Sequence, residues 1–99
     1  MRRCKKDANH DELVQWHRHL GWDMAETYQL GQYVPGFPDA IGVHPVSLIT
    51  VLFEFKSPGG KLNKAERMFH ALWRGPIEIE RTVADVMANH RKYMVANGS

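Results

Sequence analysis

The stretch PGFPDAIGVHPVSLITVLFEFKSPGGKL, residues 35–62, decides the fold of this chain. Its centre is an apolar run from Leu48 to Phe55, rich in β-branched and aromatic residues. Pro45 precedes the run, and a proline and two glycines (residues 58–60) follow it. A run of this length and composition, bounded by turn residues, predicts a strand at the centre of a sheet, buried on both faces.

Charged side chains stand at the end of this predicted strand. Because successive side chains of a strand point to opposite faces, Glu54 and Lys56 share one face. Asp39 precedes a second short apolar segment, residues 40–43, and would lie opposite Glu54 if the two segments form a hairpin or adjacent strands. Two converging carboxylates suit magnesium or manganese, and Lys56 beside them would activate water or stabilise a phosphate. The alternative is a salt-bridged strand end in solvent.

Two motifs together resemble a known family. G-F-P-D at residues 36–39, followed by F-E-F-K-S-P-G-G-K-L at residues 53–62, resembles the PD-(D/E)xK nuclease superfamily, in particular its virus-type replication-repair nuclease (VRR-NUC) domain. The resemblance covers residues 10–90. It implies an α/β fold with a restriction-endonuclease-like αβββαβ core, in which helices flank a mixed central sheet. It also implies an endonuclease that hydrolyses DNA phosphodiester bonds with Mg²⁺ or Mn²⁺, leaving a 5′-phosphate and a 3′-hydroxyl.

The resemblance also assigns roles to residues. It implies that Asp39, Glu54 and the backbone carbonyl of Phe55 hold the metal, with Lys56 as the catalytic lysine. An acidic residue on the first helix often completes such sites, and Glu12 is the candidate here. Glu12 is equally well explained as the partner of Asn9 in a helix capping box.

One position departs from the family pattern. Relatives usually carry a glutamine on the helix after the lysine, and this chain has Glu66 there. Glu66 stands three residues after Asn63, the spacing of a capping box, so we expect it to cap that helix. The alternative is that Glu66 adds a ligand to the metal.

The second helix and its surroundings carry the residues expected to bind DNA. Lys61, Lys64, Arg67 and Arg74 are predicted to face a phosphate backbone. Small stand-alone relatives look like dimeric junction-resolving or nicking enzymes of phage origin, so the resemblance implies branched or junction DNA as substrate and a homodimer. The alternatives are a nucleic-acid-binding module that is inactive or needs a partner to cleave, and a plain structural domain.

Composition sets the remaining limits. Ninety-nine residues with 43% hydrophobic content form one domain, which we place at residues 9–96, after a basic arm at residues 1–8 and before a tail at 97–99. The single cysteine, Cys4, suits a reducing compartment. No stretch is long enough to span a membrane, and because no apolar segment follows the charged first residues, we expect no secretion. We therefore expect no membrane partner and a location in the cytoplasm of a bacterial or phage-infected cell.

Local patterns predict the other elements. We expect a first helix to Leu20, a first strand within residues 27–34, a fourth strand at residues 77–80 with one wet face, and a third helix capped by Thr82. His10, His17 and His19 are expected to be solvated or at the edge of the core rather than a zinc site. Two apolar stripes are expected to be buried: Ala65, Met68, Phe69, Leu72 and Trp73 on the second helix, and Val83, Val86, Met87, His90 and Met94 on the third.

Overall fold

The computed structural model describes residues 6–94, and the sequence folds there into three helices and four strands. The elements are α1 (His10–His19), β1 (Asp23–Glu26), the 3₁₀ helix η1 (Tyr28–Gln32), β2 (Ala40–Val43), β3 (Thr50–Phe55), α2 (Lys64–Leu72), β4 (Ile77–Glu80) and α3 (Val83–Met94). This confirms the predicted α/β class and the order of helices and strands. Most of the predicted basic arm and the whole predicted tail lie outside the described residues.

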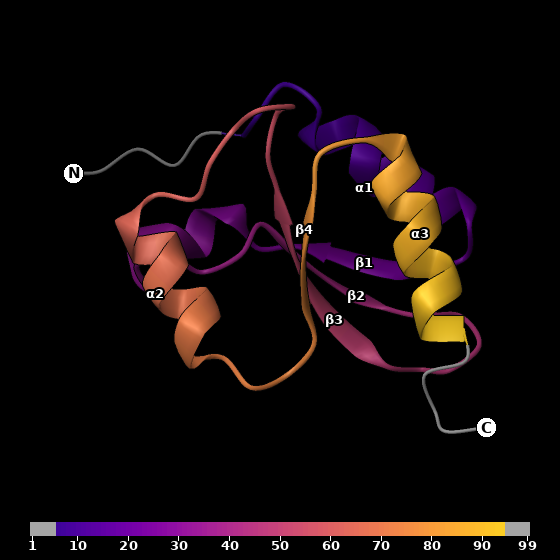
Figure 1. Cartoon of the computed structure of the whole chain (residues 1–99). Helices are drawn as coiled ribbons and strands as arrows, with labels where there is room; N and C mark the ends of the chain where they lie inside the picture. Colours follow the sequence, from indigo (N-terminus) through magenta and orange to yellow (C-terminus); the bar gives the residue numbers. More distant parts are fainter. Residues whose placement is uncertain (1–5, 95–99) are drawn as a thin grey trace.

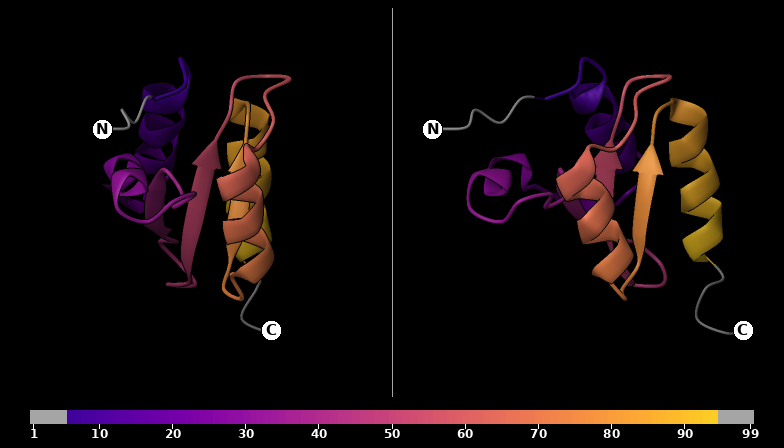
Figure 2. Two further views of the ribbon diagram at one scale, coloured as in Figure 1. Left: turned by 90° about the vertical axis from the view of Figure 1, so that its left-hand side faces the viewer. Right: turned by 60° about the vertical axis from the view of Figure 1, so that its left-hand side comes forward.

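The four strands form one mixed sheet, as predicted, and their order in the sheet is β1-β2-β3-β4. The first three strands are antiparallel, whereas β4 runs parallel to β3. A parallel pair needs a crossover connection, which here contains α2. Helices α1 and α3 pack against each other, and β4 lies between α2 and α3 (Figures 1 and 2). The end of β3 is therefore covered from both sides.

The hydrophobic core lies between β3 and the pair α1 and α3. The alternation predicted for β3 is confirmed, because Val51, Phe53 and Phe55 enter this core while Glu54 does not. The other core side chains are Leu13, Val14, Trp22, Ala40, Val86 and Tyr93. Glu54 is nevertheless buried, on the face of the sheet that looks toward α2. The sheet thus carries an apolar core on one face and a buried carboxylate on the other.

A buried hydrogen-bonded pair joins α1 to β4. His17 Nε2 lies 2.8 Å from Glu80 Oε1, and Asn89 donates to Glu80 Oε2 at 2.8 Å. His10 and His17 are fully buried, so the prediction that they are solvated or at the edge of the core is wrong, as is the prediction of a wet face on β4. A buried carboxylate needs such partners. Asn89 supplies one. The buried residues of α3 are Val86, Asn89 and Tyr93, so Val86 is confirmed and the rest of the predicted buried stripe is not.

The first strand lies upstream of its predicted position. It ends at Glu26, which pairs with Ala40, the first residue of β2. Beyond that pair β1 has no strand to pair with, and residues 28–32 form η1. Thr27 still donates its amide to the Asp39 carbonyl, but the residue before Asp39 is Pro38, which has no N–H to continue the ladder. The Thr27 hydroxyl bonds to the Pro38 carbonyl instead. Tyr28 and Tyr33 are thus not strand residues.

Three smaller expectations also change. Strand β3 begins at Thr50, because Leu48 has φ +61° and lies exposed in a turn that the His44 ring organises. Asn9 does not cap α1 but donates its side chain to the carbonyls of Lys56 and Arg81, so its capping box with Glu12 is wrong. On α2 no residue is fully buried, and three of the predicted stripe are exposed: Met68, Leu72 and Trp73.

We expect His17→Ala to lower the free energy of unfolding by about 3 kcal/mol, because it leaves the Glu80 carboxylate buried without its closest partner. His19→Ala, two residues away on the same helix but exposed, should change it by less than about 0.5 kcal/mol. Urea denaturation at neutral pH compares the two. Equal effects would contradict the role given to the buried pair.

Candidate metal centre at the end of the β2–β3 hairpin

The loop before β2 delivers Asp39 to the end of β3. Gly36 has φ +80°, and a Cβ atom there would lie 2.2 Å from the Ala65 carbonyl oxygen, so only glycine lets this loop pass so close to α2. The Asp39 amide donates to the Phe53 carbonyl at 2.9 Å. Ala40 pairs with Phe53, which places Asp39 opposite Glu54 as predicted. Asp39 also accepts a hydrogen bond from the Phe55 amide through Oδ2, at 2.8 Å.

Asp39 and Glu54 form a coupled carboxyl pair. Burial raises the pKa of Glu54, and the neighbouring charge of Asp39 raises it further. Burial also raises the pKa of Asp39, against the opposing effect of its hydrogen bonds to Glu54 and Phe55. The pair therefore keeps a proton at pH values where ordinary carboxyl groups have lost theirs. A divalent cation would replace that proton, because it favours the ionised form of both groups.

Lys56 meets Glu66 from α2 beside this pair. Its Nζ lies 2.8 Å from Glu66 Oε1, and that carboxylate also accepts from the Asn63 amide at 2.8 Å. The predicted capping box of Asn63 and Glu66 is confirmed, and Glu66 in addition holds the lysine. Burial lowers the pKa of Lys56, but the hydrogen bond and charge of Glu66 outweigh it and raise the pKa overall. Lys56 is thus a cation rather than a free base.

His70 is a site residue that the sequence analysis missed. It follows Glu66 by four residues, so both side chains lie on the same face of α2. Its Nε2 atom lies 3.6 Å from Glu54 Oε1, which is too long for a hydrogen bond. Both atoms are buried without a hydrogen-bond partner. Burial lowers the pKa of His70, which favours the neutral ring. The spacing of four residues from Glu66 is the sequence signal that could have identified His70.

The other predicted site residues do not enter this cluster. Glu12 is exposed on α1, where it lines a shallow hollow together with Gln15, Trp16, Arg18 and His19. That hollow consists of side chains of one helix and contains none of the carboxyl pair. Lys61, Lys64, Arg67 and Arg74 are all exposed, on α2 or beside it. The exception is the Phe55 backbone, whose amide binds Asp39; the metal-binding role predicted for the Phe55 carbonyl stays a prediction.

The loop after Lys56 is held firmly at both ends. Asp7 accepts from the Ser57 amide at 2.6 Å and from its hydroxyl at 3.1 Å. Arg81 donates to the Gly60 carbonyl at 2.7 Å. Asp7 belongs to the predicted basic arm, so this part of the arm is docked on the domain. These bonds fix the backbone next to Lys56.

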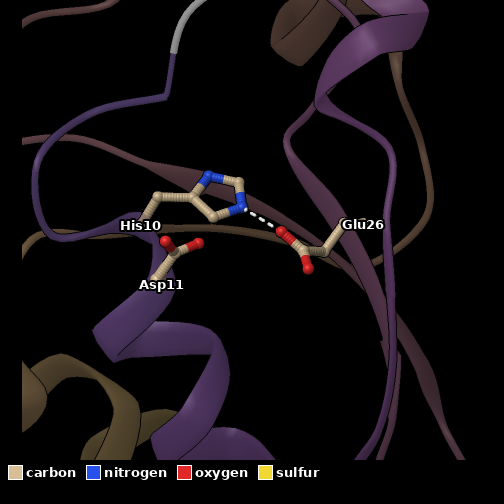
Figure 3. Close-up of side chains that lie close together, drawn as sticks. All are labelled: His10, Asp11 and Glu26. Carbon is tan, nitrogen blue, oxygen red and sulfur yellow. Dashed lines mark hydrogen bonds and ion pairs between the residues drawn. The ribbon is translucent and has the colours of Figure 1, made fainter.

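A second acidic cluster lies at the start of α1. Figure 3 shows His10, Asp11 and Glu26 close together, with the His10 ring directed at Glu26. The Lys6 ammonium already lies 3.0 Å from Asp11 and 3.7 Å from Glu26, and His10 Nε2 lies 2.9 Å from Glu26. Because a side-chain cation already balances these acids, this cluster is the weaker candidate for a metal.

Comparison of the chain with protein-family models, with curated proteins and with solved structures finds no match. Among residues 6–94, no helix is both long and apolar enough to cross a membrane.

We expect the stability of the metal-free protein to fall as pH rises above the ordinary glutamate value of 4.5. The raised pKa of Glu54 means that the folded state binds more protons than the unfolded state in that range, so stability falls by up to about 1.4 kcal/mol per pH unit. Glu54→Gln removes this dependence and should raise the melting temperature at alkaline pH.

Thermal melts in a chelator from about pH 5 to about pH 8 measure this dependence for the wild type and Glu54→Gln. Glu12→Gln, on the exposed face of α1, is the matched control and should keep the wild-type profile. Parallel profiles for the wild type and Glu54→Gln would contradict the shared proton.

Proposed function

We propose that this chain is an Mg²⁺- or Mn²⁺-dependent endodeoxyribonuclease of the VRR-NUC type with a restriction-endonuclease-like core. The observation that carries the proposal is the meeting of Asp39, Glu54 and Lys56 at one end of the central hairpin. Burying two carboxyl groups together costs free energy that a structural role would not require. The oxygen donors fit a hard cation, and Glu54 Oε1 is a buried acceptor without a partner.

In this proposal Asp39, Glu54 and the Phe55 carbonyl hold the metal. The bound cation would supply Lewis acidity and lower the pKa of a water molecule. Lys56, as an ammonium, would orient the attacking water and stabilise charge on a phosphate oxygen. The products would be a 5′-phosphate and a 3′-hydroxyl. Glu66 would fix the position of Lys56 through the ion pair at 2.8 Å.

The exposed basic residues of α2 support DNA as the substrate. Lys64, Arg67 and Arg74 lie on or next to the helix that covers the carboxyl pair, and Lys61 precedes it. Cations there would neutralise the phosphates that flank the scissile bond. So small a domain has little surface to read base sequence, which favours recognition of branched or junction DNA. The site of action would be the cytoplasm of a bacterial or phage-infected cell.

One observation favours the second candidate, a nucleic-acid-binding module that is inactive or needs a partner to cleave. The ammonium of Lys56 is fully engaged with Glu66, where the family pattern has an uncharged glutamine. In such a module, DNA binding or a partner would have to release Lys56 before cleavage.

We expect metal-dependent cleavage of an end-labelled panel comprising linear duplex, single strand, flap and four-way junction, with the junction cut fastest. Asp39→Ala and Lys56→Ala should each lower the rate by at least about 100-fold, because each removes a group that stabilises the transition state. Lys92→Ala, which removes an exposed lysine paired with Glu78, is the control. Binding without cleavage in either metal would favour the inactive or partner-dependent module.

We also propose that the protein is a homodimer that uses the exposed apolar side of α2. Met68 and Leu72 lie one turn apart, and their side chains are unusually exposed for their type, at 55% and 76%. Two copies joined there would place two metal centres against the two strands of one junction.

Equilibrium sedimentation should give twice the chain mass of 11.4 kDa. Leu72→Glu should shift the protein to a monomer, because it places a charge in the apolar contact. Ala88→Glu, at an exposed position of α3, should leave the dimer intact. A wild-type monomer at micromolar concentration would rule the dimer out.

A further inference from the structure

We propose that His70 is a nitrogen ligand of the same metal centre and makes it select Mn²⁺ over Mg²⁺. The proposal rests on the proposed function, because it assumes that Asp39 and Glu54 hold a divalent cation. It concerns a residue that neither the sequence motifs nor the family resemblance includes.

Two unpaired atoms face each other at this point. Glu54 Oε1 belongs to a side chain that is only 2% exposed, and His70 Nε2 belongs to one that is 14% exposed. Neither atom has a hydrogen-bond partner, and they lie 3.6 Å apart. Leaving a buried donor or acceptor unpaired is unfavourable, so the arrangement calls for a group that both atoms bind.

The separation of these atoms suits a cation between them. Two ligand atoms about 2.1 Å from one metal lie about 3.0 Å apart at a right angle and about 3.4 Å apart at a tetrahedral angle. The observed 3.6 Å is close to this range. A direct hydrogen bond would need the two atoms closer together than a shared cation would. The geometry therefore fits coordination better than a broken hydrogen bond.

The backbone holds His70 in this position. The capping box of Asn63 and Glu66 fixes the start of α2, and the Glu66 ion pair with Lys56 ties the same helix face to the end of β3. The Phe69 ring, next to His70 in the sequence, packs edge to face against Phe37 of the loop that leads to Asp39. Two contacts close to His70 thus anchor this part of α2.

The chemistry of the ligand set defines the selectivity. Mg²⁺ prefers an all-oxygen shell, whereas an imidazole nitrogen favours first-row transition metals. An oxygen pair with one imidazole therefore binds Mn²⁺ more tightly than Mg²⁺. The selectivity of this centre would then reside in a residue of α2 rather than in the carboxyl pair.

The test uses Mn²⁺ and Mg²⁺ as probes of the full chain without DNA. Calorimetric titration should show Mn²⁺ binding at least about tenfold tighter than Mg²⁺. His70→Gln should weaken Mn²⁺ binding about tenfold and Mg²⁺ binding by less than about threefold. His19→Gln, an exposed histidine on α1, is the control. Electron spin echo spectra of bound Mn²⁺ should show coupling to a nitrogen nucleus that disappears in His70→Gln.

Asp39→Asn separates failure of this inference from failure of the proposed function. Suppose that Asp39→Asn weakens Mn²⁺ binding, but His70→Gln has no effect and no nitrogen coupling is seen. This result overturns the role of His70 and supports the carboxyl centre. A nitrogen coupling that survives His70→Gln also overturns it, because another imidazole then supplies the ligand. Absence of Mn²⁺ binding, or binding insensitive to Asp39→Asn, overturns both proposals.

Discussion

The hydrogen bond from the Phe55 amide to Asp39 Oδ2 is the constraint on which the site depends. Strand β2 can pair with β3 through backbone groups only as far as Asp39, because Pro38 has no N–H to donate. The Asp39 side chain adds one further bond beyond that point, because its Oδ2 atom accepts from the Phe55 amide. Because a side-chain oxygen accepts here in place of a backbone carbonyl, the carboxyl group is held against Glu54 at the end of the central strand. Without it, Asp39 would be an ordinary loop residue.

The charges around that point compensate one another across secondary-structure elements. On the core face of the sheet, His17 and Asn89 satisfy Glu80. On the opposite face, Glu66 satisfies Lys56, and the Asp39 and Glu54 pair keeps a proton because burial disfavours a second negative charge. Glu54 Oε1 and His70 Nε2, both in the described part of the chain, face each other there without a hydrogen-bond partner. A cation is the ligand that removes both defects together, which is why the account centres on a metal.

Much of this could be predicted from sequence where pattern and local chemistry agree. The apolar run of β3 and the capping box of Asn63 and Glu66 are local signals, and both were found. The burial of His17 and Glu80 was not predictable, because their partners are distant in sequence and an alternating strand normally has one wet face. The 3₁₀ helix η1 was not predictable either. Tyrosine and threonine favour strands, but the strand stops where Pro38 prevents further pairing with β2. His70 was not predicted because the family motif names ligands on strands. His70 comes close to Glu54 only because α2 packs over the end of β3.

The position of a metal ion tests the central claim most directly. Crystals grown with Mn²⁺ and measured at the manganese absorption edge would locate it by anomalous scattering, independently of any assay. We expect one strong peak in contact with the Asp39 and Glu54 carboxylates and with His70 Nε2. A peak only at His10, Asp11 and Glu26, or no ordered peak within coordination distance of Asp39 and Glu54, would contradict it.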